Sequence, residues 1–115
     1  MMNGLKQNFP HFINDYVSQL VETFQPQVVL LFGSQATGTA HEDSDVDLLV
    51  LMDHDKRRDV DQEIEIDRVI PRTFPLDIIV RKPSDFQRRI EAKDMALATM
   101  WENGKKLYER KPHYA

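Results

Sequence analysis

The sequence predicts an α/β fold, in which helices cover both faces of a small mixed β-sheet. Three short segments rich in Val, Leu and Ile, residues 28–32, 46–51 and 76–80, are typical of strands buried on both faces. Helical patterns come before, between and after them, so the order is helix, strand, strand, helix, strand, helix. Strands this apolar need helices on each side of the sheet.

The first two helices are predicted from apolar periodicity. Apolar residues recur at steps of three and four between Phe9 and Phe24, with Pro10 in the first turn and Pro26 after the end. We interpret this stripe as core packing. Residues 59–70 fit a second helix that ends at Pro71. Its predicted apolar stripe consists of Val60, Ile64 and Ile70, and leaves out Ile66.

The last third of the chain predicts further helix and an edge strand. Ser84 and Gln87 form a capping-box pattern, and residues 95–101 continue helically to a stop at Asn103-Gly104. Residues 105–109 can add a short edge strand. The side chains expected to pack here are Phe86, Ile90, Met95, Met100 and Trp101.

Length and composition favour one cytoplasmic domain. The 115 residues, 1–115, have room for a single compact core, and the absence of cysteine excludes disulfides and thiolate metal sites. Residues 1–9 lack the pattern of a secretory signal, and no stretch approaches the ~18 apolar residues of a membrane span. We therefore expect no membrane partner.

Charge is unevenly distributed along the chain, although the net charge is only −4. Residues 42–67 contain eleven acids and three bases, whereas residues 68–115 contain eleven bases and six acids. Each charge taken singly is best explained as solvated surface. Together they also fit a cation-binding acidic site beside a basic face. Composition does not choose between the two.

Three carboxylates occupy strand positions. Asp45 and Asp47 bracket Val46 at the start of one predicted strand, so their side chains point to the same face. Asp77 lies in another strand, and neighbouring strands are only ~4.8 Å apart. Clustered carboxylates raise each other's pKa unless a cation joins them. Mg²⁺ is the natural choice because it prefers oxygen ligands and often binds carboxylates together with substrate phosphates.

A second feature, Gly33-Ser34, directly follows the first predicted strand. Glycine lets the backbone approach a ligand closely, and exposed N–H groups at such a turn suit phosphate oxygens. Neither this pair nor an Asp-x-Asp is specific alone. Gly-Ser after a strand, ten residues, Asp-x-Asp opening the next strand and a third strand Asp are far more specific together.

These residues resemble the GSx10DxD motif of the DNA polymerase β-like nucleotidyltransferase superfamily, and the short chain is most similar to its minimal nucleotidyltransferases. The resemblance implies that Gly33 and Ser34 bind the triphosphate of a nucleotide, with ATP as the family default. It implies that Asp45 and Asp47 bind magnesium, as a pair of ions, and that Asp77 serves as a further ligand or as the base for an acceptor hydroxyl. No position of the core motif is substituted.

One position departs from the family pattern. Many relatives have arginine directly after Gly-Ser, where this chain has Gln35. The positive partner of the triphosphate is then expected elsewhere, at Arg57, Arg58 or Arg72, and the sequence does not choose among them.

The resemblance also implies a partner. Stand-alone minimal nucleotidyltransferases resemble antitoxins that attach AMP to a tyrosine of a HEPN-domain toxin, and the short chain leaves no room for its own acceptor-binding domain. A homo-oligomer that builds the acceptor pocket is the other arrangement; nucleic acid is not an expected partner. The expected partner-facing surface is basic and comprises Arg81, Lys82, Arg88, Arg89 and Lys93.

Two other functions stay open at this point. One is a module that binds nucleotide or neutralises its partner without turnover, and the other is an aminoglycoside-type enzyme that modifies a small molecule. Other sites are excluded by pattern. An EF-hand would need glycine at Leu48 and glutamate at His54, no P-loop motif occurs, and the four histidines lack metal-ligand spacing.

Overall fold

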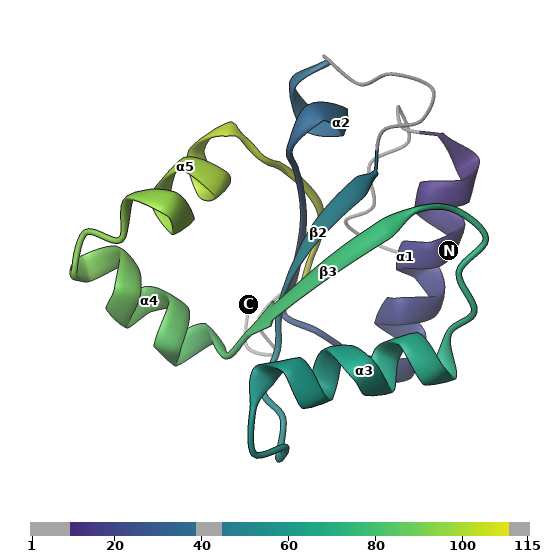
Figure 1. The fold of residues 1–115 in the computed structure, drawn as a ribbon, viewed down its shortest axis with the longest axis horizontal. Coiled ribbons are helices and arrows are strands. Elements are labelled where there is room, and N and C mark those ends of the chain that lie inside the picture. Colours follow the sequence, from purple (N-terminus) through teal and green to yellow (C-terminus); the bar gives the residue numbers. More distant parts are fainter. Residues whose placement is uncertain (1–9, 39–44, 111–115) are drawn as a thin grey trace.

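The fold is a four-stranded mixed sheet with the strand order β3-β2-β1-β4, seen in a computed structural model that describes residues 10–38 and 45–110 (Figure 1). β1 runs antiparallel to β2 and β4, and β2 runs parallel to β3. The α/β prediction, the three apolar strands and the added edge strand are all confirmed. The strands are β1 Val28–Phe32, β2 Val46–Leu51, β3 Leu76–Arg81 and β4 Lys105–Glu109.

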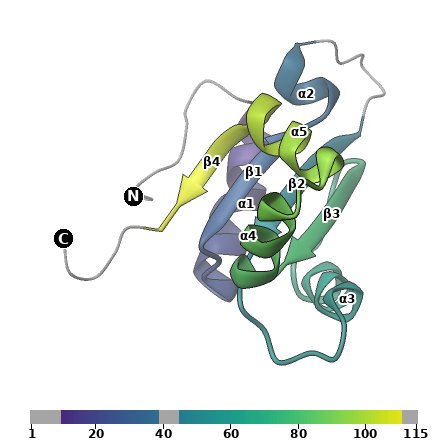
Figure 2. The same cartoon turned by 90° about the vertical axis from the view of Figure 1, so that its left-hand side faces the viewer.

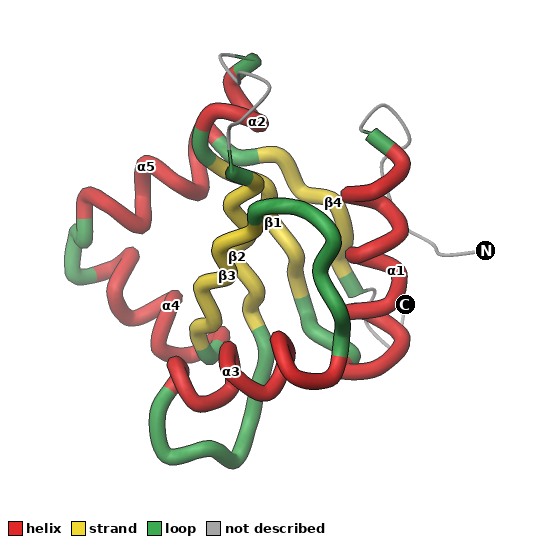
Figure 3. Tube along the Cα trace, turned by 45° about the vertical axis from the view of Figure 1, so that its right-hand side comes forward, coloured by secondary structure: helices red, strands yellow, loops and turns green. Residues whose placement is uncertain are grey.

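Helices cover both faces of this sheet. α1 (His11–Phe24) and α3 (Asp59–Val69) pack on one face, while α4 (Pro83–Glu91) and α5 (Met95–Asn103) pack on the other (Figures 2 and 3). Because side chains alternate along a strand, each face has its own apolar cluster. None of the helices among the described residues is long and apolar enough to cross a membrane.

The first helix matches its predicted stripe closely. α1 begins after Pro10, and Gln25 ends it in a left-handed conformation with φ of 52°. Its inward residues are buried, as predicted. Phe12 is 45% exposed, but its ring contacts Phe74 at a centroid distance of 4.8 Å. Phe9 lies outside the described residues.

The helix α3 is confirmed, but its predicted apolar stripe is wrong at two of three positions, since only Ile70 of that stripe is buried. Ile66 is fully buried, whereas Val60 and Ile64 are 42% and 57% exposed. The helix is oriented partly by a polar contact, since the Glu63 carboxylate accepts a hydrogen bond from the Val80 N–H of β3 at 2.9 Å. This contact turns the face that carries Ile66 toward the sheet. The spacing of apolar residues along the sequence cannot predict such a polar contact.

The region after β3 departs from the predicted pattern in two ways. α4 begins at Pro83 with Lys82 as its N-cap, so the capping box predicted at Ser84 is wrong; proline already fits the first turn without a side-chain cap. Lys93, with φ of 64°, separates α4 from α5 and interrupts the predicted continuous helix. The Asp94 side chain then caps α5 by accepting the Leu97 N–H at 3.2 Å.

Packing in this region is as predicted except at one position. Phe86 is buried, and its ring centroid lies 5.3 Å from that of Trp101. Met100 and Ile90 pack against the same cluster. The prediction that Met95 packs is wrong, since its side chain is 74% exposed.

Candidate active site

The motif residues meet at one end of the sheet, where β1 ends and β2 and β3 begin. Asp47 is in register with Phe32 of β1 on one side and with Asp77 of β3 on the other. Residues in register point to the same face, so the two carboxylates are neighbours across strands ~4.8 Å apart. Asp45 precedes β2 and is exposed. We call Gly33, Asp45, Asp47 and Asp77 the carboxylate end of the sheet.

Like charges are coupled at the carboxylate end. The pKa of Asp47 is raised, first because the half-buried side chain loses water and then because Asp77 and Asp45 carry the same charge. Asp47 is thus the central carboxylate of the three. A positive ligand that neutralised the cluster would relieve this repulsion.

Gly33 joins the first strand to this cluster. Its backbone angles, φ 76° and ψ −156°, lie in a region that residues other than glycine rarely adopt. A Cβ atom at Gly33 would lie 2.4 Å from Oδ2 of Asp47, which is too close for any real contact. Glycine is therefore required both for the turn and to let the backbone approach the carboxylate.

Ser34 opens a short helix that the sequence did not predict. α2 (Ser34–Thr37) stands at the carboxylate end (Figure 1), and the N–H groups of Ala36 and Thr37 bond the Gly33 carbonyl oxygen. Ser34 itself is half-buried beside Gly33. The spacer between Gly-Ser and Asp-x-Asp continues through residues 39–44, which lie outside the described residues.

The structure separates the three arginines proposed for the triphosphate. Arg57 and Arg58 lie in the segment after β2, at the opposite end of the sheet, and Arg58 bonds Asp61 at 2.9 Å. Arg72 precedes β3 and donates hydrogen bonds to Asp67 and to the carbonyl oxygen of Leu76, the residue before Asp77. Its pKa is raised chiefly by Asp67, with a smaller effect of Asp77. Arg72 is therefore the one of the three that adjoins the carboxylate end.

The carboxylates alone supply only part of the ligand set of a magnesium ion. Across the part of the chain that the structure describes, no three His, Cys, Asp or Glu side chains are arranged to hold a metal ion on their own. Mg²⁺, however, usually keeps several waters and binds one or two carboxylates together with substrate phosphates. The aligned pair Asp47 and Asp77, with coupled charges, fits that mode.

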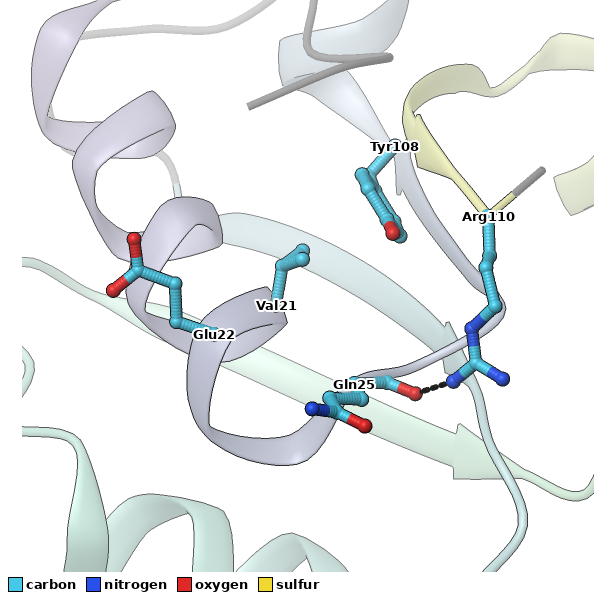
Figure 4. Close-up of a pocket in the computed structure, with 5 residues that line it drawn as sticks. All are labelled: Val21, Glu22, Gln25, Tyr108 and Arg110. Atoms are coloured by element: carbon cyan, nitrogen blue, oxygen red, sulfur yellow. Dashed lines mark hydrogen bonds between the residues drawn. The ribbon is translucent and has the colours of Figure 1, made fainter. Parts of the chain in front are cut away.

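Among the described residues, one pocket lies near the carboxylates and another lies at the opposite end of the sheet. The first, about 470 Å³, lies between Gly33 and α5. The second, about 310 Å³, is lined by residues of α1 and β4 at the opposite end, where Arg110 donates a hydrogen bond to the Gln25 carbonyl oxygen (Figure 4). The sequence did not predict either pocket. The only signal for the first is the spacing of Met95, Thr99 and Asn103 by four residues along one helix face.

Comparison with known proteins agrees with this geometry. The family model "Polymerase beta, Nucleotidyltransferase" matches residues 14–113. A crystal structure of a candidate nucleotidyltransferase from Sulfolobus solfataricus is similar at a TM-score of 0.55 and 24% identity, over 68% of this chain and 70% of that chain.

A structure described as a toxin–antitoxin with AMP-PNP has a TM-score of 0.48 and 20% identity, over 84% of this chain and 73% of that chain. No curated protein gives a significant match. The family model covers most of the sequence and includes Gly33, Asp45, Asp47 and Asp77. The chain therefore belongs to the polymerase β nucleotidyltransferase family.

Proposed function

We propose that this chain is a magnesium-dependent nucleotidyltransferase that moves AMP from ATP to a hydroxyl acceptor. The observation that carries the proposal is the alignment of Asp47 with Asp77, directly against the backbone of Gly33. This arrangement keeps two like charges side by side and leaves no room for a side chain at the turn. A purely structural sheet end would gain nothing from either feature.

Each residue of the carboxylate end has a role in this reaction. Asp45 and Asp47 would hold magnesium, which supplies charge neutralisation of the triphosphate when it is bound, and Asp77 would serve as a further ligand or as the base for the acceptor hydroxyl. The backbone of Gly33 and the hydroxyl of Ser34 would bind the phosphates beyond the α-phosphorus. The chain thus contributes mainly positioning and electrostatic stabilisation.

The transfer itself is a single displacement. The acceptor hydroxyl oxygen forms a bond to the α-phosphorus, the bond from that phosphorus to the bridging oxygen breaks, and pyrophosphate leaves with the electron pair. The acceptor proton passes to a base, a role for which Asp77 is the candidate. Because Asp47 has a raised pKa, it ionises at higher pH than an ordinary aspartate. Activity should therefore rise with pH over the acidic range in which Asp47 loses its proton.

The acceptor we propose is a tyrosine of a HEPN-domain partner, in an antitoxin role. The resemblance to minimal nucleotidyltransferases supports it. The basic segment after β3 is the candidate partner surface, although part of its charge is neutralised within the chain. Arg88 bonds Asp85 at 2.5 Å, and Arg89 lies 3.6 Å from Asp94. Their side chains are still 72% and 56% exposed, so both can contact a partner.

A transfer assay tests the proposal. The purified chain is incubated with α-labelled ATP and magnesium, with and without a HEPN-domain protein from a neighbouring gene. We expect label on a tyrosine of the partner, and its loss in Asp77→Asn but not in Asp61→Asn, a control acid at the opposite end of the sheet. Label on an aminoglycoside instead would assign a small-molecule acceptor.

A matched measurement separates catalysis from binding. If Asp47→Asn still neutralises the partner as well as the wild type, the chain acts by contact and the proposed transfer is wrong. If the variant loses neutralisation but still binds the partner, transfer is the function.

A further inference from the structure

An apolar pocket shares a wall with the carboxylate end. The pocket of about 470 Å³ is bounded on one side by Phe32 and Gly33 at the end of β1, and on the other by α5. Phe32 is the register partner of Asp47, and Gly33 adjoins its carboxylate. Any molecule whose phosphates lie at Gly33 therefore has this pocket within a few ångströms.

The lining of the pocket is unsuited to phosphate and suited to a flat, neutral ring. Its lining is mainly apolar, with Met95, Ala96 and Met100 on the helix side, and no charged side chain among the described residues lines it. Methionine sulfur makes favourable contacts with aromatic rings. Thr99 and Asn103 add polar groups on the same helix face. An asparagine amide offers a donor and an acceptor together, the pattern that pairs with the edge of a purine.

The exposure of Met95 points to a ligand. This side chain is 74% exposed beside the pocket, although burial of an apolar side chain is favourable. The core does not use it, since it lies outside both apolar clusters of the described residues. A ring seated in the pocket would cover it.

We propose that this pocket between Gly33 and α5 binds the nucleobase of the nucleoside triphosphate, an inference that rests on the proposed function. Its volume is within the range of small-molecule sites, ~300–1,000 Å³. The alternative occupant is the phenol ring of the acceptor. The strand order argues against it, because Asp77, the candidate base, lies on β3 and the pocket lies beside β1, with β2 between them. The pocket is thus on the phosphate-binding side of the carboxylates.

The test separates the base from the phosphates. Ala96→Leu and Thr99→Leu fill the pocket from two positions, and Glu102→Leu places the same side chain on an exposed part of α5 outside it. Magnesium-dependent binding of ATP and of inorganic tripolyphosphate is measured by calorimetry, after thermal melting has shown that each variant folds. We expect the two filling variants to weaken ATP binding about tenfold and to leave tripolyphosphate binding within twofold, with no effect of Glu102→Leu.

Four results would overturn the inference. Unchanged ATP binding in both filling variants would show that the base lies elsewhere. Unchanged ATP binding with a lost transfer to the protein acceptor would assign the pocket to the acceptor ring. If the wild-type chain binds neither ATP nor tripolyphosphate, both the proposed function and the assignment of the base pocket are wrong. If it binds tripolyphosphate but shows no additional affinity for ATP, only the assignment of the pocket is wrong.

Discussion

Acidic residues lie in opposite electrostatic surroundings at the two ends of the sheet. At the carboxylate end, Asp47 and Asp77 lie in register and repel each other. At the other end, acids and bases form pairs along the loop after β2 and the adjoining α3, and we call this the paired end. Its pairs are His54–Asp59 at 2.7 Å, Lys56–Glu65 at 3.2 Å and Arg58–Asp61 at 2.9 Å.

This difference separates acids that form ion pairs from acids that form a cluster, a distinction that the sequence of the acidic segment does not reveal. Acids at the paired end hold a loop onto a helix, and exposed pairs of this kind stabilise a fold by about 0–1 kcal/mol each. The carboxylate end instead costs stability, since like charges about 4 Å apart repel by ~1 kcal/mol even in water. A cluster kept in spite of this repulsion is better explained by ligand binding than by folding.

The largest expected effect comes from Asp47→Asn. The variant should lower the rate of nucleotidyl transfer by about 10²–10³, the usual loss when one charge-stabilising group is removed from an active site. It should also make the ligand-free chain more stable, by on the order of 1 kcal/mol, because the cost of burying a charged carboxylate and the repulsion from Asp77 both disappear. Initial rates and chemical denaturation measure the two effects.

The pH dependence of this stabilisation has a definite sign. A carboxyl whose pKa is raised in the folded state binds its proton more tightly there than in the unfolded chain, so the wild type loses stability as pH rises through that pKa. The gain in Asp47→Asn should therefore be present at neutral pH and vanish below the pKa of an unfolded aspartate. Asp61→Asn, at the paired end, should instead lose stability. A variant at position 47 that was both active and less stable would contradict the comparison.

Gly33→Ala tests the contact between the turn and the carboxylate. It should destabilise the fold by about 2 kcal/mol, because alanine is strained at this backbone conformation and its Cβ, 2.4 Å from Oδ2 of Asp47, would force that carboxylate to move. Gly38→Ala is the matched control, since φ is 79° there but nothing lies within 4 Å of the added atom. Its cost should be about 1 kcal/mol. Equal losses in the two variants would show that the contact with Asp47 has no energetic weight.

Arg72 and Arg58 compare a cation at each end of the sheet. Arg72→Gln should lower the rate of transfer about tenfold, because a positive charge next to Asp77 is lost and Leu76 loses its guanidinium donor. Arg58→Gln removes an exposed pair with Asp61 and should leave the rate unchanged. Loss of activity in both variants, or in Arg58→Gln alone, would remove the assignment of Arg72. Thermal melting separates this effect from the loss of the bond between Arg72 and Asp67.

Much of this arrangement follows from local sequence. An unbroken apolar pattern is enough to predict the central strands, and strand spacing with alternation is enough to predict that Asp77 can join Asp47. Alternation alone does not give the exact register across β2 and β3, which places Asp47 directly opposite Asp77. The roles of these carboxylates in metal binding and catalysis stay predictions.

The errors share a physical cause, since in each a tertiary contact outweighs the local pattern. In α3, the bond from Val80 to Glu63 selects the face that buries Ile66, although Val60 and Ile64 make a more regular stripe. Met95 has an apolar side chain of the kind usually found in the core, but it borders a pocket. The choice among the three arginines depends on which end of the sheet each adjoins, and that information is not present in the sequence near them.

The smallest expected effect is at the paired end, in Asp59→Ala. Because Nδ1 of His54 accepts the Lys56 N–H at 3.1 Å, Nε2 is the ring nitrogen that donates a hydrogen bond to Asp59. Removing the carboxylate leaves this buried donor unpaired and should cost about 1–2 kcal/mol. Asp59→Asn keeps an acceptor and should cost less. Both variants should transfer nucleotide at the wild-type rate below their melting temperatures, because the pair is remote from Asp47; a fall in rate would mean that the two ends of the sheet are coupled.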